Sequence, residues 1–144
     1  MIARKNHKTH GLGRAGEKLM AGEFLLARIP IEEMPPNHRD YDLIAYPRKN
    51  SPQRICVKCR PLSGSQIHFR PKKSDWLAIV LVEKRPHRFF IVPHKVAAKH
   101  SKSAFDGAFL RIYPRNVPKA FSQYENNFRL NPRPKRAIAP VSSN

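Results

Sequence analysis

The segment from Trp76 to Val82 restricts the fold more than any other part of the sequence. Its seven residues, WLAIVLV, are all apolar. A strand with one solvated face alternates apolar and polar residues, whereas a strand covered on both faces is apolar throughout. We therefore expect a strand from Trp76 to Glu83 inside a sheet that carries packed layers on both faces. The turn Lys84–His87 and the run Arg88–Val92 predict its hairpin partner.

Other helices and strands are predicted on both sides of this strand in the sequence. Apolar spacing predicts a helix over about residues 14–28, and the prolines at 30, 35 and 36 predict an irregular connection after it. Further expected elements are strands at 40–46, 54–59 and 67–69, a helix from Pro93 to about Lys99, an edge strand at 109–113 and a final helix at 119–128. This order predicts an α/β fold with a central mixed sheet flanked by helices. We expect one domain at 13–130, a basic arm at 1–12 and a disordered basic tail at 131–144.

The charge of the chain predicts a polyanionic partner. It has 28 Lys and Arg against 10 Asp and Glu, a formal net charge of +18. Such a field attracts nucleic acids and makes association sensitive to salt. DNA is the expected partner, and RNA stays open because charge does not separate the two. The basic residues that we expect to contact it are Arg4, Lys5, Lys8, Arg14, Lys72, Lys73, Arg133, Lys135 and Arg136.

Membrane and secretory signals are not expected from the sequence. The first residues lack the apolar core of a signal peptide, and the run Trp76–Val82 is far shorter than a membrane span. The sequence therefore predicts a soluble cytoplasmic protein, with a homodimer as an open option.

Two neighbouring predicted strands carry the candidate chemistry. Alternation along residues 54–59 places Ile55 and Val57 on one face and Cys56 and Lys58 on the other. Asp42 lies in the strand before it. Some sites that cut phosphodiesters with a divalent cation have a lysine on the same strand face as a metal-binding position. An aspartate from the adjacent strand lies beside that lysine. The competing interpretations are a solvated turn carboxylate at Asp42 and an edge-strand lysine that blocks aggregation.

Three motifs follow one another in a recognisable order: Gly16-Glu17, then Asp40-Tyr41-Asp42-Leu43-Ile44, then Ile55-Cys56-Val57-Lys58. Three later runs also match the pattern of a known family in order and spacing: Asp75–Val80, Phe89–Pro93 and Tyr124–Phe128. Over about residues 11–130 the chain resembles the PD-(D/E)XK endonuclease superfamily. The closer likeness is to its small single-domain members, which are restriction-endonuclease-like or Holliday-junction-resolvase-like.

The resemblance implies a role for each matched residue. Asp42 would be the metal ligand, Lys58 the group that orients or activates the attacking water, and Glu17 an additional acid from the helix. Cys56 stands where the family has Glu, Asp or Gln. The carbonyl at Val57, with Asp42 and Glu17, would then supply oxygen ligands for Mg²⁺ or Mn²⁺. Glu23 competes with Glu17, since it lies nearer the centre of the helix's apolar arc.

The predicted function is therefore a metal-dependent DNA endonuclease. Two alternatives stay open: a catalytically impaired nucleic-acid-binding protein on the same fold, and a ribosome-associated RNA-binding protein. A zinc site is a further alternative, because Cys56 and Cys59 form a C-x-x-C and His7 and His10 an H-x-x-H. A regular strand would put the two cysteines on opposite faces, which disfavours zinc.

Overall fold

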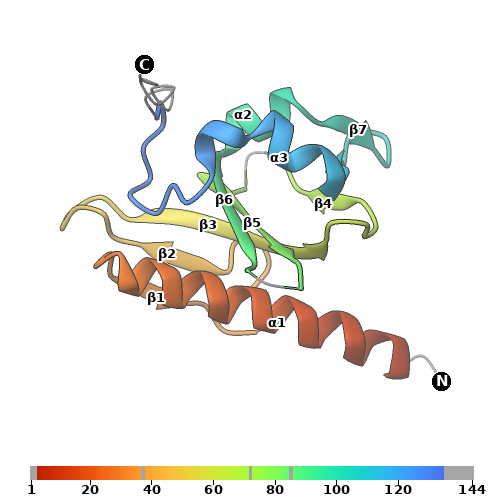
Figure 1. Ribbon diagram of the computed structural model, residues 1–144, viewed down its shortest axis with the longest axis horizontal. Coiled ribbons are helices and arrows are strands. Elements are labelled where there is room, and N and C mark those ends of the chain that lie inside the picture. Colours follow the sequence, from red (N-terminus) through yellow and green to blue (C-terminus); the bar gives the residue numbers. More distant parts are fainter. Residues whose placement is uncertain (1–2, 37, 72, 85, 135–144) are drawn as a thin grey trace, which may run out of the picture.

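A mixed five-stranded sheet forms the centre of the protein (Figure 1). The computed structural model describes residues 3–36, 38–71, 73–84 and 86–134, with side chains from Leu12 onward. In the sheet, β3 and β5 are parallel and all other neighbours are antiparallel. The strands, in spatial order, are β1 (Ile31–Glu33), β2 (Leu43–Ala45), β3 (Gln53–Pro61), β5 (Trp76–Val82) and β6 (Arg88–Pro93).

A smaller antiparallel sheet and the helices complete the layers. The small sheet has the order β4 (Ile67–Phe69), β8 (Phe109–Ile112), β7 (Lys102–Ala104). Figure 1 shows the long helix α1 (Ala3–Leu26) along one side of the large sheet, with the short helices on the other side. These short helices are α2 (His94–Lys99), α3 (Val117–Ala120) and the 3₁₀ turns η1 (Pro114–Asn116) and η2 (Ser122–Tyr124). The fold is therefore α/β, with a central mixed sheet flanked by helices, as the sequence predicts.

Strand β5 separates two apolar cores. Ala78 and Val80 belong to the core beneath α1, and Leu77, Ile79 and Leu81 belong to the core on the opposite face. All five are fully buried. The predicted covered strand is thus confirmed, and its lack of polar residues follows from having packed layers on both sides.

Strand β1 and the start of α1 differ from the sequence prediction. Residues 31–33 form an edge strand where the prolines predicted an irregular connection, because Pro30 and Pro35 flank this strand rather than interrupt it. Helix α1 begins at Ala3 rather than near residue 14. The strand predicted at 40–46 is shorter, Leu43–Ala45.

The C-terminal third differs more. The predicted edge strand at 109–113 is β8, which lies in the middle of the small sheet, and its partner β7 was not predicted. The helix predicted at 119–128 is wrong, since α3 ends at Ala120. Asn126 and Leu130 adopt positive φ angles of 57° and 56°, which a continuous right-handed helix excludes. No described helix is long and apolar enough to cross a membrane.

Candidate active site

Asp42 immediately precedes the first residue of β2 and lies directly beside β3. The β2–β3 register pairs Leu43 with Ile55, and continuing it places Asp42 opposite Cys56. The backbone N–H of Asp42 donates to the Ile55 carbonyl at 2.8 Å. Its carboxylate Oδ2 accepts a hydrogen bond from the Val57 N–H at 2.7 Å. The carboxylate is therefore fixed in place by backbone of the strand that carries Lys58.

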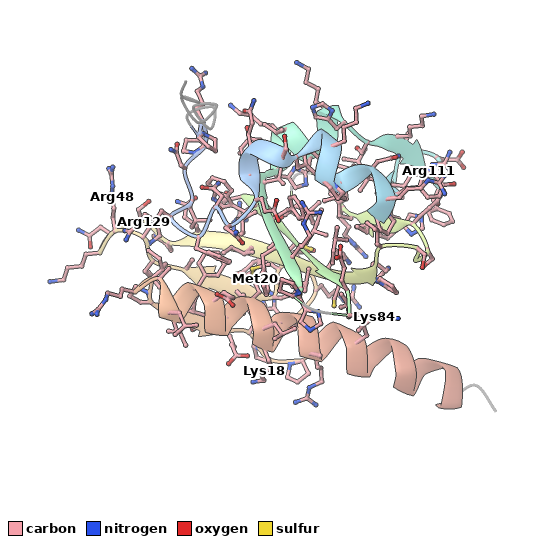
Figure 2. All side chains as sticks on the ribbon, viewed as in Figure 1. Lys18, Met20, Arg48, Lys84, Arg111 and Arg129 are labelled. Carbon is pink, nitrogen blue, oxygen red and sulfur yellow. The ribbon has the colours of Figure 1, made fainter. Side chains whose placement is uncertain are left out.

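Helix α1 approaches this strand closely at one glycine. A Cβ added at Gly16 would lie 2.5 Å from the Cys59 Cβ, so only glycine permits this separation of helix and strand. Met20 and Phe24 continue the contact as fully buried members of the core beneath α1. In Figure 2, Met20 lies on the sheet side of α1 and Lys18 on the opposite side. The residue after this glycine is Glu17, which lies close enough to Asp42 for the aspartate's charge to act on it.

The pKa values of Glu17 and Asp42 are both raised, and the charge of Asp42 contributes to the shift of Glu17. Burial is the largest cause that raises the pKa of Glu17, and the negative charges of Asp42 and Glu33 raise it further. Burial also raises the pKa of Asp42, although the Val57 hydrogen bond and the charges of Lys58 and His38 oppose this. Two partly desolvated carboxyl groups thus lie within electrostatic range of each other, an arrangement that a cation would relieve.

Cys56 and Lys58 lie on the Asp42 side of β3. Burial raises the pKa of the Cys56 thiol to about 11, with Lys58 opposing the shift and Asp42 and Glu17 adding to it. Burial therefore keeps the thiol in its neutral form near pH 7. Among the described residues, Lys58 forms no salt bridge, so its half-buried ammonium group stays available.

The donor atoms suit a hard cation in type. Asp42 and Glu17 offer carboxylate oxygens, and the Val57 carbonyl points to the same side of β3 as its N–H, toward Asp42. Oxygen donors are what Mg²⁺ prefers, and it usually retains several waters. In the part of the chain that is described, no three His, Cys, Asp or Glu side chains are grouped closely enough to hold a metal by themselves.

Two residues near the site were not singled out from the sequence. His38 lies close enough for its charge to act on Asp42, and its Nδ1 lies 3.0 Å from the Tyr41 carbonyl. Glu33 acts on Glu17 and pairs with Lys18 at 2.9 Å. Nothing in the sequence pattern marks either residue. Glu33 belongs to β1, which was not expected, and His38 lies in the loop that follows it.

Other expected site residues are placed as follows. Glu23 lines a separate hollow with Glu83 and Glu125, away from Asp42. Cys56 packs toward the core opposite α1, whereas Cys59 is part of the core beneath α1, so the two thiols lie on opposite faces of β3 as expected. The side chains of His7 and His10 lie outside the described residues.

The expected nucleic-acid contacts are only partly described. Arg14, Lys73 and Arg133 are exposed, and the charge of Arg14 acts on Glu17. Lys72, Lys135 and Arg136 lie outside the described residues, as do the side chains of Arg4, Lys5 and Lys8.

The α/β fold, a central mixed sheet flanked by helices, is similar to that of a solved structure. A solved structure of a bacterial homing endonuclease, I-Ssp6803I, is similar to this chain with a TM-score of 0.52 and 14% sequence identity. The likeness covers 70% of this chain and 74% of that one. No protein-family model and no curated protein matches the sequence. At this identity the likeness concerns the fold.

Proposed function

We propose that the protein is a metal-dependent DNA endonuclease of the PD-(D/E)XK type, with Cys56 in place of the second acidic residue. The observation that carries the proposal is that Glu17 lies close enough to Asp42 for the aspartate's charge to raise its pKa, beside Lys58, which forms no salt bridge among the described residues. Acids whose pKa values are shifted by burial and by a neighbouring charge are typical of catalytic sites.

Each residue of the site has a distinct task in the proposed reaction. Asp42 and Glu17, with the Val57 carbonyl, would hold a Mg²⁺ or Mn²⁺ ion. When bound, such an ion supplies charge that activates water and stabilises the transition state of phosphodiester hydrolysis. The Lys58 ammonium, on the same face of β3 as Asp42, would orient the attacking water or contact the phosphate.

The proposed substrate is DNA because of both charge and fold. The chain carries a net charge of +18, which favours association with a polyanion. The similar solved structure is that of a homing endonuclease. Each phosphate that a basic residue neutralises adds close to one unit to the slope of log affinity against log salt.

One observation favours a second candidate function, a nucleic-acid-binding protein without catalysis. Cys56 holds a neutral thiol where an oxygen ligand would complete the metal site. Sulfur is a poor ligand for magnesium. In this second candidate the same basic surface would bind DNA and no strand would be cut.

Nicking of supercoiled plasmid in Mg²⁺ or Mn²⁺ separates the two. We expect cleavage by the wild-type protein and none by Asp42→Asn or Lys58→Ala, with DNA affinity retained. Asp40→Asn, two residues earlier on the same segment, is the matched control and should cleave normally. Equal nicking by wild type and Asp42→Asn, or no nicking by any folded protein, would remove the nuclease proposal.

A further inference from the structure

A surface hollow of about 520 Å³ lies at the opposite end of β2 from Asp42. The β2–β3 turn forms one wall with Pro47 and Arg48, and the segment from Arg129 to Pro132 forms the other. The volume is within the range of pockets that bind small molecules. We call it the arginine hollow.

The charge of this hollow favours an anion. Arg48 and Arg129 are both exposed, and neither forms a salt bridge among the described residues. Figure 2 shows the two side chains close together at one end of the molecule. The described lining contains no Asp or Glu. By contrast, a second hollow of about 770 Å³ is lined by Glu23, Glu83 and Glu125, and its one arginine, Arg88, is paired with Glu125.

The rest of the lining is apolar and held in place. Pro47, Leu130 and Pro132 contribute apolar surface, and Trp76, which is otherwise buried, also lines the hollow. The Trp76 indole N–H donates to Gln53 Oε1 at 2.8 Å, and the Gln53 amide donates to Ser51 Oγ at 3.1 Å. A flat apolar ring would therefore meet a wall that needs no rearrangement.

The other wall is fixed by a buried asparagine. The Asn127 amide donates to the Asn131 carbonyl at 2.9 Å and to the Ile91 carbonyl at 3.1 Å. Its Oδ1 accepts a hydrogen bond from the Asn131 N–H at 3.1 Å. The segment that carries Arg129 is thereby anchored to β6.

We propose that the arginine hollow binds one unpaired nucleotide of a DNA strand, with its phosphate between Arg48 and Arg129 and its base against the apolar wall. A base within a duplex is stacked and paired, so only a terminal, branched or extruded nucleotide enters a hollow of this kind. The identity of the polymer as DNA rests on the proposed function, whereas nucleotide binding by the hollow does not require Asp42.

The hollow is suitably placed to act with the candidate site. Gln53 and the pair Cys56 and Lys58 lie on one strand, about 10 to 16 Å apart at roughly 3.3 Å per residue. That separation equals about three to five nucleotides at a rise of 3.4 Å per step. The substrate class that follows is DNA with an unpaired nucleotide a few positions from the cleaved phosphate.

Trp76, the single tryptophan of the chain, offers a direct readout. We would titrate the Asp42→Asn protein with thymidine 5′-monophosphate and follow tryptophan fluorescence, beside thymidine and inorganic phosphate. We expect a saturable change with the monophosphate, and weaker binding of either component alone. Each arginine replaced by alanine should weaken binding by about tenfold, since it removes a charge-assisted hydrogen bond.

The matched control is Arg111→Ala/Arg115→Ala. Arg111 lies on the opposite side of the molecule from Arg48 (Figure 2), Arg115 lies in η1, and neither lines the arginine hollow. This control should bind the monophosphate normally, unlike Arg48→Ala/Arg129→Ala. No saturable change with the monophosphate in folded Asp42→Asn protein would overturn the proposal. Equal binding of inorganic phosphate would also overturn it, since a simple anion site would then suffice.

A second measurement tests the unpaired nucleotide itself. In the Asp42→Asn background, Arg48→Ala/Arg129→Ala should weaken binding of a forked duplex about tenfold more than binding of a blunt duplex of the same length. Equal loss for the two DNAs would show ordinary backbone contacts and overturn the inference. Because Asp42→Asn is used throughout, these results do not depend on whether the wild-type protein cleaves DNA.

Discussion

Replacing Gly16 with alanine should destabilise the protein, although alanine is the better helix former. In an exposed helix interior, glycine to alanine gains about 1 kcal/mol. The added Cβ would lie 2.5 Å from the Cys59 Cβ, and an ordinary carbon contact needs about 3.5 Å. Both atoms are attached directly to backbone, so α1 or β3 must move by about 1 Å. We assign this the upper end of the usual overpacking cost, about 3 kcal/mol, which leaves a net loss of about 2 kcal/mol.

Gly22, on the same helix, provides the matched control. A Cβ added there meets nothing within 4 Å, so Gly22→Ala should stabilise the protein by about 0.5–1 kcal/mol. Urea denaturation followed by circular dichroism would measure both variants, with unchanged slopes in denaturant. The two free energies of unfolding should therefore differ by about 3 kcal/mol.

A double-mutant cycle identifies the contact. Cys59→Gly removes the opposing Cβ and should lower the cost of Gly16→Ala, whereas Cys59→Ala retains that atom and should rescue it much less. If the Gly16→Ala and Gly22→Ala proteins had the same free energy of unfolding, the close approach of α1 to β3 would be refuted. The placement of Glu17 beside Asp42 would then lose its structural reason.

Three further predictions follow from the site and its supports. Asp42→Asn keeps an acceptor for the Val57 N–H but removes a carboxylate whose pKa is raised. The native state of the wild type binds that proton more readily than the unfolded state, so its stability falls as pH rises from the ordinary aspartate pKa through the raised one. Urea titrations should therefore find Asp42→Asn relatively more stable at pH 7, with the advantage absent at a pH below both values, and an unchanged difference would contradict this. Asn127→Ala should cost about 1–3 kcal/mol, because it leaves the Ile91 and Asn131 carbonyls without their buried partner, whereas exposed Asn50→Ala should cost almost nothing in the same denaturation assay. Deleting residues 132–144, which include Arg133, Lys135 and Arg136, should flatten the salt dependence of DNA binding, and an unchanged slope would show that this segment does not contact the phosphates.

The centre of the sheet could be predicted from the sequence because its pattern has one physical cause. Residues 76–82 are apolar throughout, and only a strand with cover on both faces accounts for that in a chain so rich in charge. The division of β3 into an Ile55 and Val57 face and a Cys56 and Lys58 face follows from strand geometry alone. Both expectations hold in the structure.

The periphery could not be predicted because its conformation depends on contacts distant in the sequence. Strand β1 exists through pairing with β2, and its three residues carry no strand pattern of their own. The last helix fails at Asn126, where the backbone N–H donates to Phe89 in β6 and the chain takes a positive φ. Helical spacing describes neither effect.

The candidate site shows the same limit. A helical wheel favours Glu23 on the apolar arc, but the charge of Asp42 acts on Glu17, the residue that follows the glycine packed against Cys59. Glu23 instead lines the separate hollow that also contains Glu83 and Glu125. His38 and Glu33 come near the site through loop and strand placement that local sequence does not encode.

Cleavage by Cys56→Glu protein tests the central claim most directly. This substitution supplies the missing oxygen ligand beside Asp42, so Mg²⁺-dependent plasmid nicking should rise above that of the wild type. Adding Asp42→Asn to the same protein should abolish the gained activity, which assigns it to this site. A folded, DNA-binding Cys56→Glu protein that cleaves no form of DNA in Mg²⁺ or Mn²⁺ would contradict the account and leave a nucleic-acid-binding protein in its place.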